Sequence, residues 1–193
     1  MNVLKGIIFM RKRFTRFLAM MLVLCSIMAP MPVDASEVDH DSCVLAHLDI
    51  PLSYEIQHYI YELSWDYNVD PILVMAIIQK ESKCDPTVIG DSGRAIGLMQ
   101  IQQRWHYERI RALKCTDLSD PYQNILVGVH YLAELFEGDM STEWVLMAYN
   151  GGRPWANKHT LIGYTTKYAR EVLDIMDGFY EELEEKYAVE TVN

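Results

Sequence analysis

A glutamate near the end of an apolar helical run is the best candidate for chemistry in this sequence of 193 residues. Glu81 lies in the run Pro71–Lys83, and blocks rich in amide and hydroxyl groups follow at 97–101 and 148–152. A carboxyl group on a rigid helix that faces such loops can transfer a proton to and from a sugar chain. The pattern therefore predicts acid–base cleavage of a polysaccharide.

The surroundings of Glu81 favour this interpretation over an ordinary exposed glutamate, which composition alone would suggest. A negative charge near a helix C-terminus opposes the helix dipole, so the position suits a structural acid poorly. The preceding residues Met75-Ala76-Ile77-Ile78 are apolar on every side of the helix, which predicts burial nearly all round. Burial raises the pKa of a carboxyl group, and a protonated carboxyl can serve as a general acid.

Capping residues and apolar spacing predict the helices that must position Glu81. Ser53, Asp70-Pro71, Asp120-Pro121 and Ser141 each read as the start of a helix. Further helices are expected from about Met99 to Leu113 and from about Thr165 to Lys186, and Gly151 and Gly152 should end the helix that Ser141 begins. The expected fold is therefore mainly α, a compact helical domain with at most a small β-hairpin or an irregular loop near 86–97.

Four blocks, in order and at plausible spacing, resemble the soluble lytic transglycosylase (SLT) domain, which is related in fold to goose-type lysozyme. Any one block is a weak signal, but four in order are strong, and the match covers about residues 52–176. The blocks are Glu81-Ser82; Gly97-Leu98-Met99-Gln100-Ile101; Asp120-Pro121 with Asn124-Ile125, Gly128 and Tyr131-Leu132; and Ala148-Tyr149-Asn150 followed by glycine.

The resemblance implies a lysozyme-like fold and a lytic transglycosylase of peptidoglycan. Glu81 would protonate the β-1,4 glycosidic oxygen between N-acetylmuramic acid and N-acetylglucosamine. It would then act as a base on the muramic C6 hydroxyl, which gives a 1,6-anhydro product without water. The substrate's own acetamido group would stabilise the charged intermediate, so a second carboxylate is not needed.

The resemblance also assigns substrate-binding roles. Ser82 would orient the leaving sugar or the Glu81 carboxyl, and the tyrosine of Thr165-Thr166-Lys167-Tyr168 would lie close to Glu81. The residues expected to line the cleft or hold the acetamido group and hydroxyls are Met99, Gln100, Tyr149 and Asn150.

Each of these assignments has a structural alternative. Met99 and Tyr149 could be plain core residues, and the Gln100 amide could serve the backbone. Asp85 and Asp91 are the nearest candidates for a second carboxylate, but both sit among turn residues, where turn roles are expected.

The sequence departs from the family pattern at two places. Tyr164 stands where the family usually has a glutamate, four positions before Tyr168. The run Gly152-Arg153-Pro154-Trp155 is bulkier than the small residues expected there. Trp155 could stack on a sugar ring or simply pack, and the sequence favours neither.

Two other functions remain open from the sequence. A hydrolytic muramidase on the same fold would need a second carboxylate to activate water. A non-catalytic glycan-binding component of an envelope-spanning machine would have no need of a carboxyl group at the position of Glu81.

The N-terminus has the layout of a secretory signal, with a basic leader, an apolar run from Phe17 to Ala29 and a small-residue exit at Ala35. The alternative is an uncleaved membrane anchor. We therefore expect a signal peptide at 1–35, a polar tail at 36–50, a transglycosylase domain at 51–180 and an acidic tail at 181–193. The protein should be exported to the periplasm, the cell-wall compartment or the outside of the cell.

Charge and cysteine content limit the partners. Residues 36–193 carry 12 basic and 26 acidic residues, a formal charge of −14, so nucleic acid is not an expected partner. The expected substrate is peptidoglycan strands, and the expected oligomeric state is a monomer. Delivery by secretion, conjugation or phage machinery is suggested only by analogy at the level of the fold. No cofactor or metal is implied. Cys43, Cys84 and Cys115 would allow one disulfide and one free thiol, and the sequence does not choose the pair.

Overall fold

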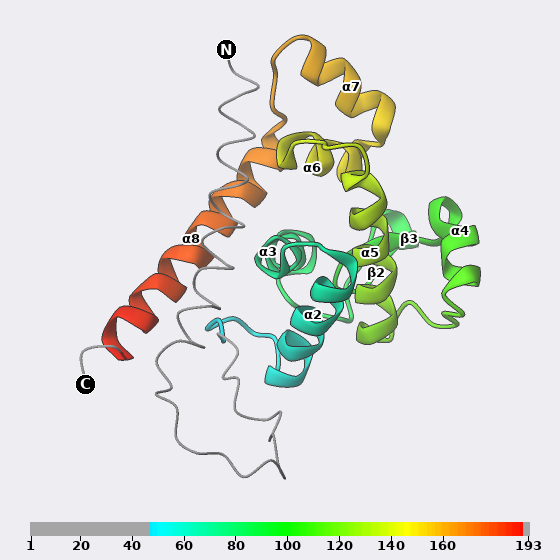
Figure 1. Ribbon diagram of the computed structural model, residues 1–193. Helices are drawn as coiled ribbons and strands as arrows, with labels where there is room; N and C mark the ends of the chain where they lie inside the picture. The colour runs from blue at the N-terminus through cyan, green and yellow to red at the C-terminus, as the bar shows by residue number, and fades with distance from the viewer. Residues whose placement is uncertain (1–46, 191–193) are drawn as a thin grey trace, which may run out of the picture. The chain divides into compact units, whose positions relative to one another are not determined.

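The computed structural model describes residues 47–190 and is mainly helical, with one small antiparallel sheet. Figure 1 shows helix α3 end-on near the centre of the described part of the chain. Helix α8 packs against α3, and α2 contacts both α3 and α5. Helix α3 is therefore the central element of the domain.

Helices α2 (Tyr54–Tyr67) and α3 (Pro71–Ser82) begin at the caps that the sequence predicts. The Ser53 side chain accepts a hydrogen bond from the Ile56 amide, and the Asp70 side chain accepts bonds from two amides of the first turn of α3. The residues of α3 from 71 to 78 are all buried, which confirms the expected helix buried nearly all round. Such burial fixes the axis that carries Glu81.

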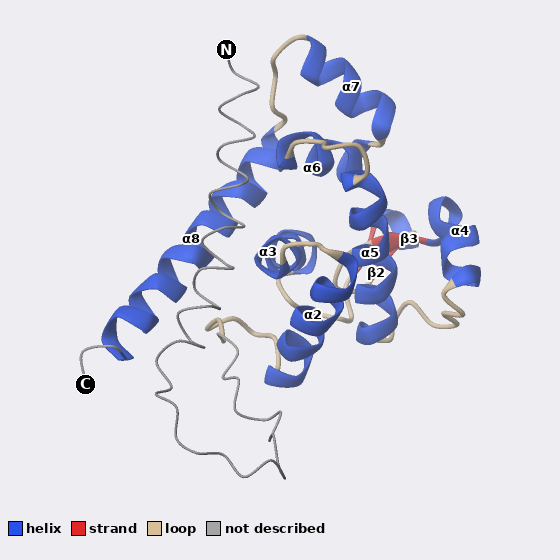
Figure 2. Cartoon of the chain, in the orientation of Figure 1, coloured by secondary structure: helices blue, strands red, loops and turns tan. Residues whose placement is uncertain are grey.

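The segment between α3 and α5 folds into three two-residue strands, a 3-10 turn and helix α4 (Gln103–Ala112). Strands β1 (Ile89–Gly90), β2 (Ala95–Ile96) and β3 (Ile101–Gln102) pair antiparallel in that order, with Ile89 opposite Ile96 and Ile96 opposite Ile101. A 3-10 turn, η2 (Asp91–Gly93), joins β1 to β2. Figure 2 shows this sheet in red beside α5. The expected small hairpin is present, and a third strand extends it.

Four more helices complete the described chain. Helix α5 (Pro121–Phe136) starts at the predicted Asp120 cap, and α6 (Thr142–Gly151) starts at the Ser141 cap. Helices α7 (Arg153–Leu161) and α8 (Lys167–Glu190) follow. Helix α6 packs against α5, α7 and α8, and so it links the later helices to the core.

One predicted helix starts later than expected, and one helix was not predicted. The helix expected from Met99 is α4 (Gln103–Ala112), which starts later because Gln100 has a left-handed backbone conformation and the next two residues pair as β3. Helix α7 was not predicted at all. It begins directly after Gly152, with proline in its first turn.

Both ends of the described chain pack on the domain. Leu48 belongs to the expected polar tail, yet it is buried, and its amide and carbonyl both bond the Gln57 side chain. Leu183 belongs to the expected acidic tail and is also buried, on a continuous α8. The expected signal peptide at 1–35 lies outside the described residues.

Cys84 and Cys115 are both buried free thiols, so the described residues contain no disulfide between them. The Cys84 thiol donates to Gln79 Oε1 at 3.1 Å, and burial raises its pKa to about 11. Pairings with Cys43 lie outside the described residues. Within residues 47–190, no helix is long and apolar enough to cross a membrane.

Candidate active site

Glu81 lies in the last turn of α3, where the backbone changes direction sharply. Lys83 and Cys84, which follow the helix, both adopt left-handed conformations, with φ of 54° and 66°. Such conformations are unfavourable for residues other than glycine, and they persist where the surroundings enforce them. The helix therefore ends abruptly, and Glu81 is held on a rigid element rather than on a loop.

Tyr168 contacts the Glu81 carboxyl directly, as the family resemblance implies. The Tyr168 hydroxyl donates a hydrogen bond to Glu81 Oε1 at 2.6 Å, from the first turn of α8. The two residues are 87 positions apart in sequence, and the packing of α3 against α8 brings them together. One carboxyl oxygen of Glu81 is therefore oriented by this hydroxyl.

The surroundings of Glu81 favour its neutral form. Burial raises the pKa of Glu81 above 4.5, while the Tyr168 hydrogen bond and the Lys80 charge act in the opposite direction. Lys80 is itself engaged, because its ammonium lies 2.7 Å from Glu171 Oε2. The net effect keeps a proton on the carboxyl group at a higher pH than in water.

Tyr149 forms the neighbouring wall of the site. Its hydroxyl donates to the Met99 carbonyl oxygen at 2.8 Å. Burial, followed by the nearby Glu81 charge, raises the pKa of Tyr149 well above its usual value. Glu81, Tyr149 and Tyr168 thus form one cluster of a carboxyl group and two neutral phenols.

A buried asparagine holds the loop that faces this cluster. Asn124 Oδ1 accepts from the Met99 amide at 2.8 Å, and Asn124 Nδ2 donates to the carbonyls of Ile96 and Leu118 at 2.7 and 2.9 Å. These three bonds attach the loop between β2 and β3, and the segment before α5, to one side chain of α5. Asn124, which belongs to the third family block, is therefore a buried polar anchor of this loop.

Gly128 allows the same loop to approach α5 closely. A Cβ at this position would lie 2.7 Å from Met99 Cε, so the Met99 side chain occupies the space that glycine leaves. Met99 is fully buried, and its side chain packs in the core instead of lining an open cleft. The geometry therefore favours the alternative in which Met99 is a core residue.

The Gln100 amide also serves the backbone. Its Nε2 donates to the carbonyls of Val88 and Gly97 at 3.0 and 2.9 Å, which stabilises the left-handed turn at Gln100. The Ser82 hydroxyl donates to the Ile78 carbonyl of its own helix at 3.1 Å. Asn150, in contrast, is exposed at the end of α6. Of the four residues expected to line the cleft, Met99 and Gln100 support the backbone, whereas Tyr149 and Asn150 are better placed to meet a ligand.

The two aspartates considered as a second carboxylate are both committed to turns. Asp85 accepts bonds from the amide and hydroxyl of Thr87, and these bonds lower its pKa. Asp91 contacts Arg94 and Gln102, and the Arg94 hydrogen bond lowers its pKa. Both are therefore held as carboxylates by local partners, as the turn interpretation predicts.

Tyr131 is a site-forming residue to which the sequence analysis gave no role. Its ring lies 5.6 Å from the Tyr149 ring, and its hydroxyl donates to the Ala148 carbonyl at 3.3 Å. The guanidinium of Arg109 lies over the Tyr131 ring, 4.7 Å from its centre. The signal was present, because Tyr131 belongs to the third family block.

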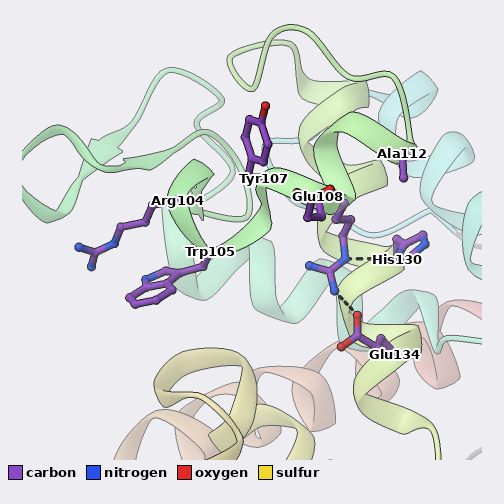
Figure 3. Close-up of a pocket in the computed structure, with 8 residues that line it drawn as sticks. Arg104, Trp105, Tyr107, Glu108, Ala112, His130 and Glu134 are labelled. Carbon is purple, nitrogen blue, oxygen red and sulfur yellow. Dashed lines mark hydrogen bonds and ion pairs between the residues drawn. The ribbon is translucent and has the colours of Figure 1, made fainter.

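A pocket of about 520 Å³ lies elsewhere, between α4 and α5 (Figure 3). Arg109 occupies it and bonds both His130 Nδ1 and the Glu134 carboxylate. Burial and the Arg109 charge lower the pKa of His106, beside this pair, to about 4. Glu81 does not line this pocket, and two of its charged groups, Arg109 and Glu134, form an ion pair with each other. No set of three or more metal-ligating side chains is clustered within the described residues.

The fold and site define a lysozyme-like helical protein with a partly buried carboxyl group, Glu81, at the end of α3. A family model described as "Transglycosylase SLT domain" matches residues 58–170, which is more than half of the chain. The chain belongs to this family, which confirms the resemblance found in the sequence.

Curated relatives agree with that membership over part of their length. A transglycosylase of Enterobacteria phage PRD1 is 38% identical over 96 residues, which cover 49% of this chain and 34% of the phage protein. The X polypeptide of Escherichia coli is 38% identical over 92 residues, covering 45% and 54% of the two chains. The invasion protein IagB of Salmonella typhimurium is 30% identical over 92 residues, covering 45% and 57%. The matched region thus spans at most a little over half of these relatives.

Among solved structures, an inactive mutant of the lytic transglycosylase Slt from Pseudomonas aeruginosa superposes with a TM-score of 0.58. The superposition covers 70% of this chain and 25% of that one, at 20% identity. It confirms the mainly helical, lysozyme-like fold.

Proposed function

We propose that this protein is a peptidoglycan lytic transglycosylase. It cleaves the β-1,4 bond between N-acetylmuramic acid and N-acetylglucosamine without water and leaves 1,6-anhydro-muramic ends. The observation that carries the proposal is the Glu81 carboxyl, whose pKa is raised by burial and which accepts a 2.6 Å hydrogen bond from Tyr168. Family membership over residues 58–170 supplies the substrate class.

The reaction begins with Glu81 as a general acid. Its proton goes to the glycosidic oxygen as the bond from that oxygen to muramic C1 breaks, and N-acetylglucosamine leaves with a free hydroxyl. The acetamido oxygen of the muramic residue bonds to C1 and takes up the positive charge. Glu81 is left as a carboxylate.

The second step returns the proton to Glu81. The muramic C6 hydroxyl attacks C1, the bond from C1 to the acetamido oxygen breaks, and the Glu81 carboxylate accepts the C6 hydroxyl proton. A group with a raised pKa is a stronger base once ionised, so the same burial assists both steps. The carboxyl group ends the cycle as it began.

Nearby residues orient this chemistry. Tyr168 fixes one oxygen of Glu81, which directs the other oxygen toward the scissile bond. The exposed Asn150 amide and the Tyr149 ring contact the acetamido group and sugar hydroxyls. Met99, Gln100 and Ser82 act indirectly, by building the loop and the helix end on which these groups sit.

The protein acts outside the cytoplasm, where its substrate lies. We further propose that it works as a monomer and that a secretion, conjugation or phage assembly brings it to the wall. The kinds of relatives found support delivery by such an assembly, among them a phage transglycosylase and a protein named for invasion.

Substitution of the proposed acid tests this function. Full-length Glu81→Gln should release no soluble muropeptides from purified peptidoglycan, yet it should still sediment with the insoluble polymer. The matched controls are Asp85→Asn and Asp91→Asn, which should retain activity because their carboxylates serve turns.

Each control also addresses the hydrolytic alternative. Loss of activity in a folded Asp85→Asn or Asp91→Asn protein would indicate a second carboxylate and a muramidase. Appreciable activity in folded Glu81→Gln would rule out the single-acid mechanism. Sedimentation without any release by the unsubstituted protein would point to a glycan-binding component.

A further inference from the structure

Residues 151–170 differ in charge from the rest of the chain. The chain has a formal net charge of −10, but this segment contains no aspartate or glutamate. Its four basic residues are Arg153, Lys158, Lys167 and Arg170. The segment comprises the end of α6, all of α7 and the start of α8. It thus presents a basic surface on an acidic protein.

Three aromatic rings of this segment lie in sequence along it; we call Trp155, His159 and Tyr164 the aromatic row. The Trp155 and His159 ring centres are 4.1 Å apart, and those of His159 and Tyr164 are 5.5 Å apart. His159 Nδ1 lies 2.8 Å from the Trp155 carbonyl oxygen, which fixes the middle ring. The two outer rings, Trp155 and Tyr164, are each 45% exposed.

Both ends of the aromatic row are close in sequence to residues of the Glu81 site. At one end, Trp155 packs on Gly151, where an added Cβ would lie 2.7 Å from Trp155 Cγ; Gly151 directly follows Asn150. At the other end, Tyr164 lies four residues before Tyr168, which bonds Glu81. A ligand held at Asn150 and Glu81 can therefore continue onto the row.

The chemistry of this surface fits a glycan that carries acidic peptides. Aromatic side chains offer apolar faces with polar edges, which suit the apolar faces of pyranose rings. Guanidinium and ammonium groups form strong hydrogen bonds with carboxylates. Within residues 47–190, neither Lys158 nor Arg170 forms an ion pair, whereas Arg153 and Lys167 pair with Glu134 and Glu171. Of these two cations, the Arg170 guanidinium lies over the Tyr164 ring, 5.6 Å from its centre, and donates to the Thr165 carbonyl, so it is held beside the row.

We propose that the aromatic row extends the substrate site beyond the cleaved bond. Trp155 and Tyr164 stack on pyranose rings of the same glycan strand, and Lys158 and Arg170 bind carboxylates of its stem peptides. The inference rests on the proposed function. It makes Tyr164, which stands where the family pattern has a glutamate, a specificity residue for acidic, peptide-bearing strands.

Binding by an uncleaving protein measures this directly. In full-length Glu81→Gln, adding Trp155→Ala or Tyr164→Ala should weaken sedimentation with insoluble peptidoglycan by about fivefold, the size expected for one lost aromatic contact. Trp155→Phe should restore most of the affinity, because it keeps a ring. Trp65→Ala, which removes a 69% exposed tryptophan from α2, is the matched control and should bind normally.

The basic residues have a separate readout. Lys158→Gln and Arg170→Gln should weaken binding to strands that carry stem peptides, but not to strands from which an amidase has removed the peptides. Tyr164→Glu should weaken binding to both kinds of strand, because the ring is lost, and should weaken binding to peptide-bearing strands further, because it places a negative charge opposite the peptide carboxylates.

Several results would overturn the inference. Normal binding by the Trp155→Ala and Tyr164→Ala proteins would do so alone, leaving the proposed function intact if the unsubstituted protein still cleaves. Equal losses on peptide-bearing and peptide-free strands in the two Gln variants would rule out contacts of Lys158 and Arg170 with stem-peptide carboxylates.

Leu161 and Ile162 are exposed beside the row, so anionic vesicles serve as a competitor. Binding to vesicles that the row substitutions abolish, with glycan binding unchanged, would make the surface a membrane contact. Failure of the unsubstituted protein to bind or cleave peptidoglycan would overturn both proposals.

Discussion

Two sets of interactions act on the pKa of Glu81 in opposite directions. Burial disfavours the charged carboxylate, whereas the Tyr168 hydroxyl and the Lys80 ammonium favour it. The first influence is the largest, so the pKa of Glu81 lies above its usual value. A general acid must be protonated when substrate binds, so activity should fall as pH rises through this pKa.

Tyr168→Phe changes this balance in a predictable direction. Loss of a hydrogen bond that lowers the pKa of Glu81 should raise that pKa further, so the alkaline limb of the pH–activity profile should move to higher pH. The maximal rate should also fall, by about tenfold or more, because the carboxyl is no longer oriented. Rates of muropeptide release across a pH series give both values. An unmoved alkaline limb would show that another group controls it.

Stability should reveal the same raised pKa. A carboxyl whose pKa is raised by folding stabilises the protein below its unfolded pKa, and this contribution is lost as pH rises through the folded pKa. Glu81→Gln lacks the buried charge, so it should be more stable than the unsubstituted protein at pH 8 and similar below about pH 4. Urea unfolding at both pH values measures the difference. A difference of equal size at both values would contradict the burial of a titrating carboxyl group.

At the scale of elements, one side chain joins the sheet and the loop to the helices. Asn124→Ala would leave the Met99 amide and the carbonyls of Ile96 and Leu118 without this partner. We expect a loss of about 3 kcal/mol in the free energy of unfolding, from unsatisfied buried groups. Gln103→Ala, on exposed α4, is a control that should cost little. A loss below about 1 kcal/mol in Asn124→Ala would contradict the anchoring role.

Local signals predicted the elements that begin with a side-chain cap. Ser53, Asp70, Asp120 and Ser141 each accept a bond from an amide of the first helical turn, and each was visible in the sequence. Helix α7 has no side-chain cap, and the preceding glycines suggested an end rather than a start. Proline in its first turn was a signal that could have revealed it.

Tertiary contacts decided what local signals could not. The left-handed turn at Gln100 depends on bonds to Val88 and Gly97, and these shift the start of α4. The roles of Met99 and Gln100 as supports of the backbone follow from the same packing. Glu81 and Tyr168 are 87 positions apart in sequence, so local signals could not predict their contact and only the family resemblance did.

At the scale of the whole molecule, the fold places one buried carboxyl group where three elements meet. Helix α3 supplies Glu81, α8 supplies Tyr168, and α6 supplies Tyr149, which also holds the loop after β2. The two aspartates nearest in sequence serve turns. This arrangement suits a reaction in which a single residue is both acid and base and the nucleophile belongs to the substrate.

The most direct measurement is the mass of products released from purified peptidoglycan in water enriched in oxygen-18. The account predicts muramic ends one water lighter than hydrolytic products and free of the heavy isotope, because the C6 oxygen of the sugar is the nucleophile. Glu81→Gln should give none of these products. Reducing muramic ends that carry oxygen-18 would contradict the account and make the protein a hydrolase.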